Sequence, residues 1–483
     1  MLYGSTRAGM FNVKAPQAIL QGIAPDGGLY VPQSIPDLYG VIGEDFISAA
    51  RQIISAFFPE FALKAEEITR TAYESQFSHP AVTPLVRVGS TYVLELFHGP
   101  TAAFKDVALC ALPQLLTAAR KYTTDDREIL ILTATSGDTG SAALAGFSNV
   151  PSTRVLVFYP QDGVSPVQKA QMVTMAGGNL KVCGIQGNFD DAQTGVKQIF
   201  ADFKPPKDLM LSSANSINMG RLVPQITYYF TAYASLLREK AIALGDMVNF
   251  VVPTGNFGDI LAGYLAKQAG LPIDKLVCAT NSNDVLNDFI QTGVYDRRRN
   301  LHKTLSPSMD ILVSSNLERL LYFVSNDAAL VTQCMDRLQN NGYYHMPIEY
   351  MQQIRESFMS GTCQDEEALN VISSAWNKYH YLMDPHTASA WKVMEDLIQK
   401  DQLNGINVVL STASPFKFSG TIAKALKINI PEDVSSVEIL SQMLGLDLPA
   451  CLKGLSDKPV LHRDVIDPTD MLNYVTDKAV EPW

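Results

Sequence analysis

Short apolar runs alternate with longer, helix-compatible stretches along most of the chain after residue 127. These runs are rich in valine, isoleucine and leucine and occupy residues 129–133, 155–159, 180–185, 210–213, 248–252, 276–280 and 408–410. Continuous apolar runs of this length are typical of strands that are buried on both faces of a parallel sheet. The pattern predicts the α/β fold class, with two parallel or mostly parallel sheet domains flanked by helices.

The helical stretches indicate where the chain divides. Apolar residues recur at i, i+3 and i+4 within 45–58, which predicts a helix in a small, mostly helical N-terminal unit, residues 1–90. A smaller α/β domain is expected over residues 91–240, and a larger one over 241–483. Within the larger domain the strand pattern disappears at about 296–381, so we expect a helical insertion there, with helices over 309–324 and 366–379.

The composition and charge of the chain favour some classes of protein and argue against others. The chain has 483 residues, of which 47% are hydrophobic and 18% are charged, as in ordinary globular proteins of two or three domains. We expect a cytoplasmic protein with no membrane partner, because no apolar run approaches a membrane span and residues 1–9 lack a signal-peptide pattern. The net charge of −11 argues against nucleic acid as a partner. Six singly scattered cysteines predict no metal site, and the choice between monomer and homodimer stays open.

Lys105 is the first candidate for chemistry. The alternating run 86–96 predicts two short strands joined at Gly89-Ser90, and Thr101 is expected to cap a helix that carries Lys105 on its first turn. The positive end of a helix dipole disfavours an ammonium and favours the neutral amine that forms a Schiff base. Taken alone, this stretch fits a solvated surface lysine better than a catalytic one.

A second candidate lies between a predicted strand and a predicted helix, in a loop made of Gly255, Asn256, Phe257, Gly258 and Asp259. Successive backbone N–H groups at a helix N-terminus can bind a phosphate. The loop lacks the Walker and G-x-G-x-x-G patterns, which weighs against a nucleotide-binding protein. An ordinary tight turn remains the alternative.

Further polar residues follow other strands. A loop with the donors to receive a carboxylate contains Ser136, Gly137, Asp138 and Thr139. Asn218 and Arg221 fall on one helix face together with Gln225. The hydroxyl of Thr412 suits a ring nitrogen, and Lys417 follows it. Helix capping explains the hydroxyl and carboxylate residues equally well, and surface exposure explains the two cations.

Five motifs in a fixed order give a specific signature. They are H-G-P-T-x-x-F-K ending at Lys105, T-S-G-D-T-G from Thr135, N-S-I-N-x-x-R from Asn215, P-T-G-N-F-G-D from Pro253, and S-T-A-S-P-x-K-F from Ser411. The set resembles the threonine synthase family, pyridoxal-phosphate enzymes with the tryptophan-synthase-β-like fold, also called fold type II. Further matching stretches extend the resemblance from the N-terminus to about Gly420.

The resemblance implies a role for each candidate. Lys105 would be the catalytic Schiff-base lysine, and Thr412 would face the pyridine nitrogen of pyridoxal 5'-phosphate. The cofactor phosphate would be held by Gly255, Asn256, Phe257, Gly258 and Asp259. The substrate would be bound by Asn218, by Ser136, Gly137, Asp138 and Thr139 at its carboxylate, and by Arg221 and Lys417 near its phosphate.

The resemblance also implies a reaction, in which O-phospho-L-homoserine and water give L-threonine and phosphate through γ-elimination and β-addition. A related phospho-lyase would instead release 2-oxobutyrate from the same substrate. The intact Gly255–Asp259 loop favours the synthase. An interaction protein that binds the cofactor but is catalytically silent is a further alternative, which the retained Lys105 disfavours.

Overall fold

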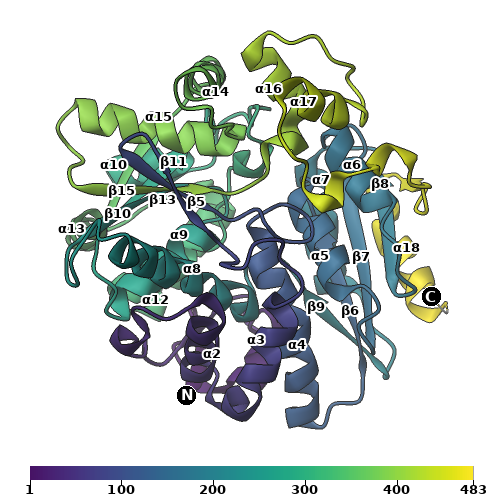
Figure 1. The fold of residues 1–483 in the computed structure, drawn as a ribbon. Helices are drawn as coiled ribbons and strands as arrows, with labels where there is room; N and C mark the ends of the chain where they lie inside the picture. The colour runs from purple at the N-terminus through teal and green to yellow at the C-terminus, as the bar shows by residue number, and fades with distance from the viewer. Residues whose placement is uncertain (482) are drawn as a thin grey trace.

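The computed structural model describes residues 1–481 and 483, and two sheets form its centre (Figure 1). The six-stranded sheet consists, in spatial order, of β14 (Phe358–Thr362), β11 (Ile273–Thr280), β10 (Val248–Pro253), β15 (Ile406–Ser411), β5 (Thr91–Glu95) and β4 (Leu85–Val88). The five-stranded sheet consists of β16 (Asp464–Ile466), β8 (Leu180–Ile185), β7 (Thr153–Pro160), β6 (Glu128–Ala134) and β9 (Leu209–Ser213). Every pairing in these two sheets is parallel except the β4–β5 hairpin. The predicted α/β fold with mostly parallel sheets is confirmed.

Alternate residues of the six-stranded sheet enter two different cores. Phe250 and Val252 of β10 pack in a cluster with helices α8 (Met219–Arg238) and α9 (Gly258–Gln268). Val251, between them, packs with Val393 of α15 (Pro385–Gln399) on the other face. Because both faces are covered, the strands read as continuous apolar runs in the sequence.

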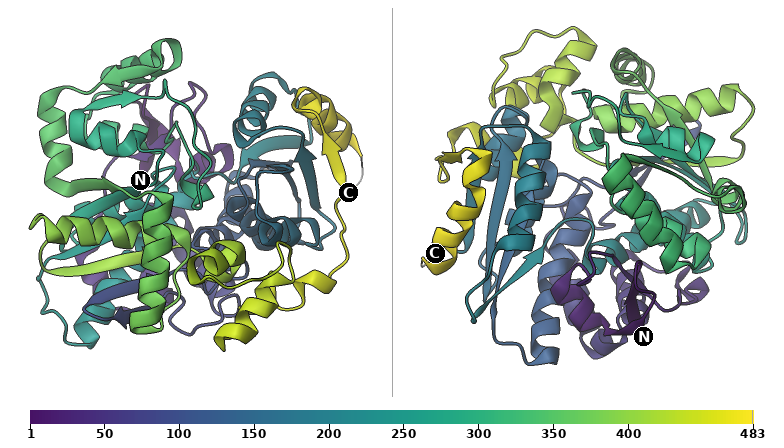
Figure 2. Two further views of the ribbon diagram at one scale, coloured as in Figure 1. Left: turned by 90° about the horizontal axis from the view of Figure 1, so that it is seen from above. Right: turned by 180° about the vertical axis from the view of Figure 1, so that it is seen from behind.

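The five-stranded sheet is covered in the same way. Ile129 and Ile131 of β6 share a cluster with residues of α4 (Lys105–Thr123) and α5 (Asp138–Phe147). Leu130 and Leu132 pack with residues of α7 (Phe189–Asp202) and α18 (Met471–Val480). Figure 2 shows the C-terminal segment, in yellow, against this sheet.

The N-terminal unit contains a small antiparallel sheet as well as helices. Its elements are β1 (Leu2–Ser5), β2 (Phe11–Lys14), α1 (Ala15–Gln21), β3 (Tyr30–Pro32), α2 (Phe46–Phe57) and α3 (Ala65–Tyr73). The predicted helix over 45–58 is α2, and the Asp45 side chain caps it by accepting from Ser48 N at 2.9 Å. Contacts of α1 and α3 with α4, and of α2 with α8, attach the unit to the central helices.

Strand pairing crosses the predicted division of the chain at two places. Strand β5 lies within the range 91–240 but pairs with β15 of the six-stranded sheet. The tail beyond residue 453 returns to the other sheet, where β16 pairs with β8. At both places a strand pairs with another strand that is far from it in the sequence. Local sequence patterns do not reveal such pairings.

The region 296–381 is mostly helical but is not free of strands. It contains α11 (Leu317–Ser325), α12 (Ala328–Asn341), β13 (Tyr343–His345), α13 (Ile348–Ser357), β14 and α14 (Asp365–Tyr379). The prediction for 366–379 is confirmed. The prediction of a helix over 309–324 is wrong in its first half, since the helix begins only at Leu317. Ser314 bonds to the carbonyl of Gly255 at 2.8 Å, so tertiary contacts hold the preceding residues as a loop.

Five further α-helices and strands belong to the fold. They are α6 (Pro166–Val173), α10 (Val285–Thr292), β12 (Val294–Asp296), α16 (Ser419–Leu426) and α17 (Ser436–Leu444). Among the residues described, no helix combines the length and the apolar character needed to cross a membrane.

Candidate active site

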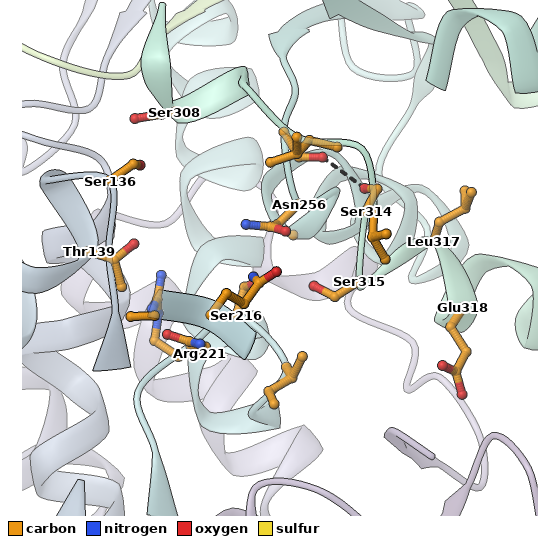
Figure 3. A pocket seen from close by; sticks show the side chains of 18 of the residues that line it. Ser136, Thr139, Ser216, Arg221, Asn256, Ser308, Ser314, Ser315, Leu317 and Glu318 are labelled. Carbon is orange, nitrogen blue, oxygen red and sulfur yellow. Dashed lines mark hydrogen bonds between the residues drawn. The ribbon is translucent and has the colours of Figure 1, made fainter. Parts of the chain in front are cut away.

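A cavity of about 640 Å³ lies where loops from both sheets meet. Its wall includes residues that follow β6, β9, β10 and β15, all at the carboxyl ends of their strands. Ligands of open α/β sheets bind at such edges. Figure 3 shows Ser136, Thr139, Arg221, Asn256 and Ser308 around this space. The structure thus brings together candidates that are far apart in the sequence.

Lys105 is the first residue of α4 and reaches the cavity wall. Its Nζ lies 3.6 Å from Oδ2 of Asp138 and 4.6 Å from the centre of the Phe104 ring. Burial lowers the pKa of the Lys105 amine; the cations Lys417 and Arg221 act in the same direction, and Asp138 opposes them. A buried amine that is readily neutral has the form required of a nucleophile toward a carbonyl.

Asp106, rather than Thr101, organises the start of this helix. The Asp106 carboxylate accepts from the backbone N–H of Thr101 at 2.9 Å and also from the Thr101 hydroxyl. Phe104 occupies the cap position and makes no capping bond with its side chain. The predicted cap at Thr101 is therefore wrong. The Thr101 hydroxyl donates to the Asp106 carboxylate instead of accepting from an N–H group of the first turn.

The loop between β10 and α9 has the geometry of an anion site. The N–H groups of Asn256 and Phe257 have no backbone acceptor among the described residues, and they precede the first turn of α9. A side chain at Gly255 would lie 2.4 Å from the carbonyl oxygen of Ser308, so the close approach of these two loops requires glycine. Phe257 contributes through its backbone, since its ring packs 5.6 Å from that of Phe358 in the core. The loop fits a phosphate group.

Asp259 is a buried carboxyl in the same loop. Burial raises its pKa to about 6, although its Oδ1 accepts from the N–H of Ile260 at 2.9 Å. A bound phosphate would be repelled by an ionised carboxylate but not by the neutral acid. The raised pKa makes Asp259 easier to protonate than an ordinary carboxyl when an anion binds beside it.

Replacement of Asp259 by asparagine is expected to stabilise the protein at pH 8 and to change little near pH 3.8, the ordinary carboxyl pKa. The raised pKa means that the stability contributed by the neutral acid is full below the ordinary carboxyl pKa and is lost as the pH rises through about 6. Asparagine cannot ionise, so the gain at pH 8 should reach about 2–3 kcal/mol. Thermal unfolding at both pH values measures it, with the exposed Asp274→Asn as control. Equal destabilisation at both pH values would contradict the assignment.

The loop after β6 presents hydroxyl groups to the cavity. Thr135 Oγ1 accepts from the N–H groups of Gly137 and Gly140, each at 2.9 Å, and this turn directs Ser136 and Thr139 toward the open space (Figure 3). Gly137 has a φ of 127°, which a residue with a side chain rarely adopts. The loop can donate to a carboxylate.

Asp138 differs from its neighbours in this loop because its carboxylate is already bound. Lys417 Nζ lies 2.8 Å from its Oδ1, and Gln168 Nε2 donates to the same oxygen at 2.9 Å. Burial alone would favour the neutral acid, but Lys417 and Lys105 keep the pKa of Asp138 well below its ordinary range. An ionised Asp138 is an acceptor and would repel a substrate carboxylate. Lys417 is fully buried and does not contribute to the cavity wall.

Of the residues predicted on the face of α8, Arg221 and Gln225 line the cavity. Arg221 is 2% exposed, donates through Nη1 to the carbonyl of Ala214, and leaves Nε without a partner. Burial lowers its pKa to about 10, and no carboxylate among the described residues forms an ion pair with it. A buried guanidinium without a counter-ion, directed into a cavity, is an anion-binding group.

Asn218 stabilises the fold and does not line the cavity. Its Oδ1 accepts from Gly220 N at 2.9 Å as the cap of α8, and its Nδ2 donates to the carbonyl of Ile19 at 2.9 Å. It is fully buried and is not part of the cavity wall. Thr412, at the end of β15, does line the cavity and is 5% exposed.

Two parts of the wall were missed by sequence reasoning. One is the loop 307–315, which contributes Ser308, Ser314 and Ser315 (Figure 3). The other is Arg7 of the N-terminal unit, whose guanidinium contacts Glu318 at 2.9 Å. The serine-rich composition of 306–315 was the available signal for the first, whereas nothing local connects Arg7 to a residue 311 positions away.

The loop 307–315 is fixed by a histidine. His386 Nε2 accepts from Ser308 N at 3.2 Å, while its Nδ1 bonds to Asp384 Oδ1 at 2.7 Å. His386 therefore supports the cavity wall. Among the described residues, no three histidine, cysteine, aspartate or glutamate side chains are grouped so that they could hold a metal ion.

Comparison with known proteins gives first the class of enzyme. Residues 77–414 match the family model described as pyridoxal-phosphate dependent enzyme. This match, the fold and the site define an enzyme that uses pyridoxal phosphate and has fold type II. The amine of Lys105 and the donors at the start of α9 are the groups that fit such a cofactor.

Further matches give the family. Residues 2–75 match the model of the threonine synthase N terminus, and residues 387–470 match that of the threonine synthase C-terminal region. Threonine synthase of Schizosaccharomyces pombe is 38% identical over 460 residues, which cover 88% of this chain and 89% of that protein. The chain belongs to the threonine synthase family, a group of carbon–oxygen lyases.

Solved structures of the family agree in fold. Threonine synthase from Brucella melitensis, crystallised with pyridoxal phosphate bound, has a TM-score of 0.87 and 37% identity over the full length of both chains. The yeast enzyme has a TM-score of 0.88 and 34% identity, covering 99% of this chain and 98% of that chain. Threonine synthase-like 1 of Homo sapiens is 39% identical over 88% of this chain, and the chain spans 59% of the length of that relative.

Proposed function

We propose that this enzyme is a threonine synthase that converts O-phospho-L-homoserine and water to L-threonine and phosphate. The observation that carries the proposal is the buried guanidinium of Arg221, which lines the same cavity as Lys105 and whose Nε has no partner among the described residues. An amino acid with a phosphate at its far end needs an anion-binding group at some distance from the amine that serves its α carbon. Relatives named threonine synthase support the same assignment.

Each group of the cavity then has a task. Bound pyridoxal phosphate supplies an electron sink that eases proton loss from carbons near the substrate nitrogen. The Lys105 amine is placed to move protons at the α and β carbons of the substrate. The Gly255–Asp259 loop would hold the cofactor phosphate through Gly255, Asn256, Phe257 and Gly258, and the hydroxyl of Thr412 would serve the ring nitrogen.

The other residues act on the substrate. Ser136 and Thr139 orient its carboxylate by donating hydrogen bonds. Arg221 stabilises the phosphate as its bond to the γ carbon breaks, before the oxygen of water adds to the β carbon. The charge of the leaving group is thereby matched by a cation that already lies in place and whose Nε has no partner among the described residues.

A product balance tests the proposal. The purified enzyme, loaded with pyridoxal phosphate, is incubated with O-phospho-L-homoserine, and phosphate, L-threonine and 2-oxobutyrate are quantified together. We expect threonine and phosphate in equal amounts. Phosphate matched by 2-oxobutyrate would identify the phospho-lyase instead, and absence of phosphate release would reject both reactions.

A cytoplasmic location forms part of the same proposal. All six cysteines are free in the structure, and five of them are buried. Unpaired cysteines of this kind are typical of proteins from reducing compartments.

A further inference from the structure

Two buried lysines share the single carboxylate of Asp138. Lys417 Nζ lies 2.8 Å from Oδ1, and Lys105 Nζ lies 3.6 Å from Oδ2. The carboxylate also accepts from Gln168 at 2.9 Å and from the Ser308 hydroxyl at 3.3 Å. Asp138 therefore connects the start of α5 with the segment after β15 and with the loop 307–315.

The two lysines do not share the carboxylate equally. Lys417 is 0% exposed and has two acceptors, Asp138 Oδ1 at 2.8 Å and the carbonyl of Thr101 at 3.0 Å. Lys105 is beyond hydrogen-bond distance of Asp138, and its Nζ lies over the Phe104 ring. Lys417 therefore bonds directly to Asp138, whereas Lys105 has no hydrogen bond to it.

Charge balance points in the same direction. The other charged groups that face Lys105 are the cation of Arg221 and the carboxyl of Asp259. Even with Asp138 and Asp259 both ionised, two ammonium groups and one guanidinium would face only two carboxylates in a buried site. Burial makes such an excess of positive charge costly, and loss of the proton from the least supported lysine relieves it.

From this geometry we infer that Lys417 is a positioning residue that occupies Asp138 and thereby keeps Lys105 as a free amine. The inference rests on the proposed role of Lys105 in the active site. It replaces the expectation that Lys417 binds the substrate phosphate. Asp138 likewise acts on Lys105 and not on the substrate carboxylate, and Gln168 holds it in place.

The test measures the protonation of Lys105 directly. The full-length chain, freed of cofactor, is labelled with traces of acetic anhydride between pH 6 and pH 11, and modification of the Lys105 peptide is quantified by mass spectrometry. In Lys417→Met the Asp138 carboxylate interacts with Lys105 without a competing lysine. The labelling midpoint, which is the pH at which Lys105 is half-labelled, should therefore rise by about one pH unit or more. Lys417→Arg should restore the original midpoint, and Lys424→Met, an exposed lysine of α16, should not change it.

A second variant gives a shift of opposite sign. In Asp138→Asn the carboxylate is lost and the cation of Lys417 stays, so the Lys105 midpoint should fall. Misfolding would not produce opposite shifts at two contacting residues. An unchanged or lowered midpoint in Lys417→Met, or a raised one in Asp138→Asn, would overturn the inference. Because the labelling uses no substrate, its outcome is independent of which product the enzyme forms.

Discussion

Replacement of Lys105 by alanine is expected to reduce phosphate release from O-phospho-L-homoserine by at least about 10⁴-fold. Lys105 is the amine that fits the cofactor carbonyl, and it is also the base proposed for two proton transfers. No other lysine of the described residues lines the cavity except Lys197 of α7. One substitution therefore removes both the attachment of the cofactor and the acid–base group.

Lys121 offers a matched control for this prediction. It lies near the end of the same helix, α4, and is exposed, so Lys121→Ala should retain full turnover. The visible absorbance of the bound cofactor provides a second measurement, since it should change in Lys105→Ala and stay constant in Lys121→Ala. Turnover of Lys105→Ala within about tenfold of the original enzyme would reject the assignment of Lys105.

Much of the fold could be predicted because its strands are buried on both faces. The run 248–252 is continuous and apolar for the physical reason seen in the structure: Val251 faces α15, while Phe250 and Val252 face α8 and α9. Short pairings were not predictable in this way. Strand β16 has three residues that are exposed or half-buried, so its place beside β8 leaves no apolar pattern in the sequence.

The part of the site that lies in loops at the ends of strands could be predicted from the sequence. Lys105, the loop that follows β10, Ser136, Thr139, Arg221 and Thr412 all reach one cavity. Lys417 and Asp138 carry the right chemical groups, but each one is the other's partner, and only the tertiary structure shows that neither is free. Asn218 is not free either, because its amide caps α8 and donates to the carbonyl of Ile19 in the N-terminal unit. A sequence motif identifies a polar residue, but it does not show whether that residue already bonds to other groups of the protein.

Replacement of Arg221 by methionine is expected to lower kcat/KM for O-phospho-L-homoserine by about 10²- to 10³-fold, the usual range for losing one group that stabilises developing charge. The absorbance of bound cofactor should not change, because the phosphate loop and Lys105 are intact. The stability of the cofactor-free protein should be equal or higher, since a buried cation without a counter-ion is removed. Steady-state phosphate release and thermal unfolding measure these effects.

Arg319 provides the contrast that makes this prediction specific. It is also fully buried, but its guanidinium donates to the carbonyls of Tyr30 and Ile217 and to the side chain of Asn316. Arg319→Met leaves these acceptors unpaired and should destabilise the protein by about 3 kcal/mol or more. If Arg221→Met instead loses stability like Arg319→Met and keeps its kcat/KM, Arg221 holds the fold and the phosphate of the substrate is bound elsewhere. Loss of catalysis without loss of stability in Arg221→Met alone is the result that an anion-binding role requires.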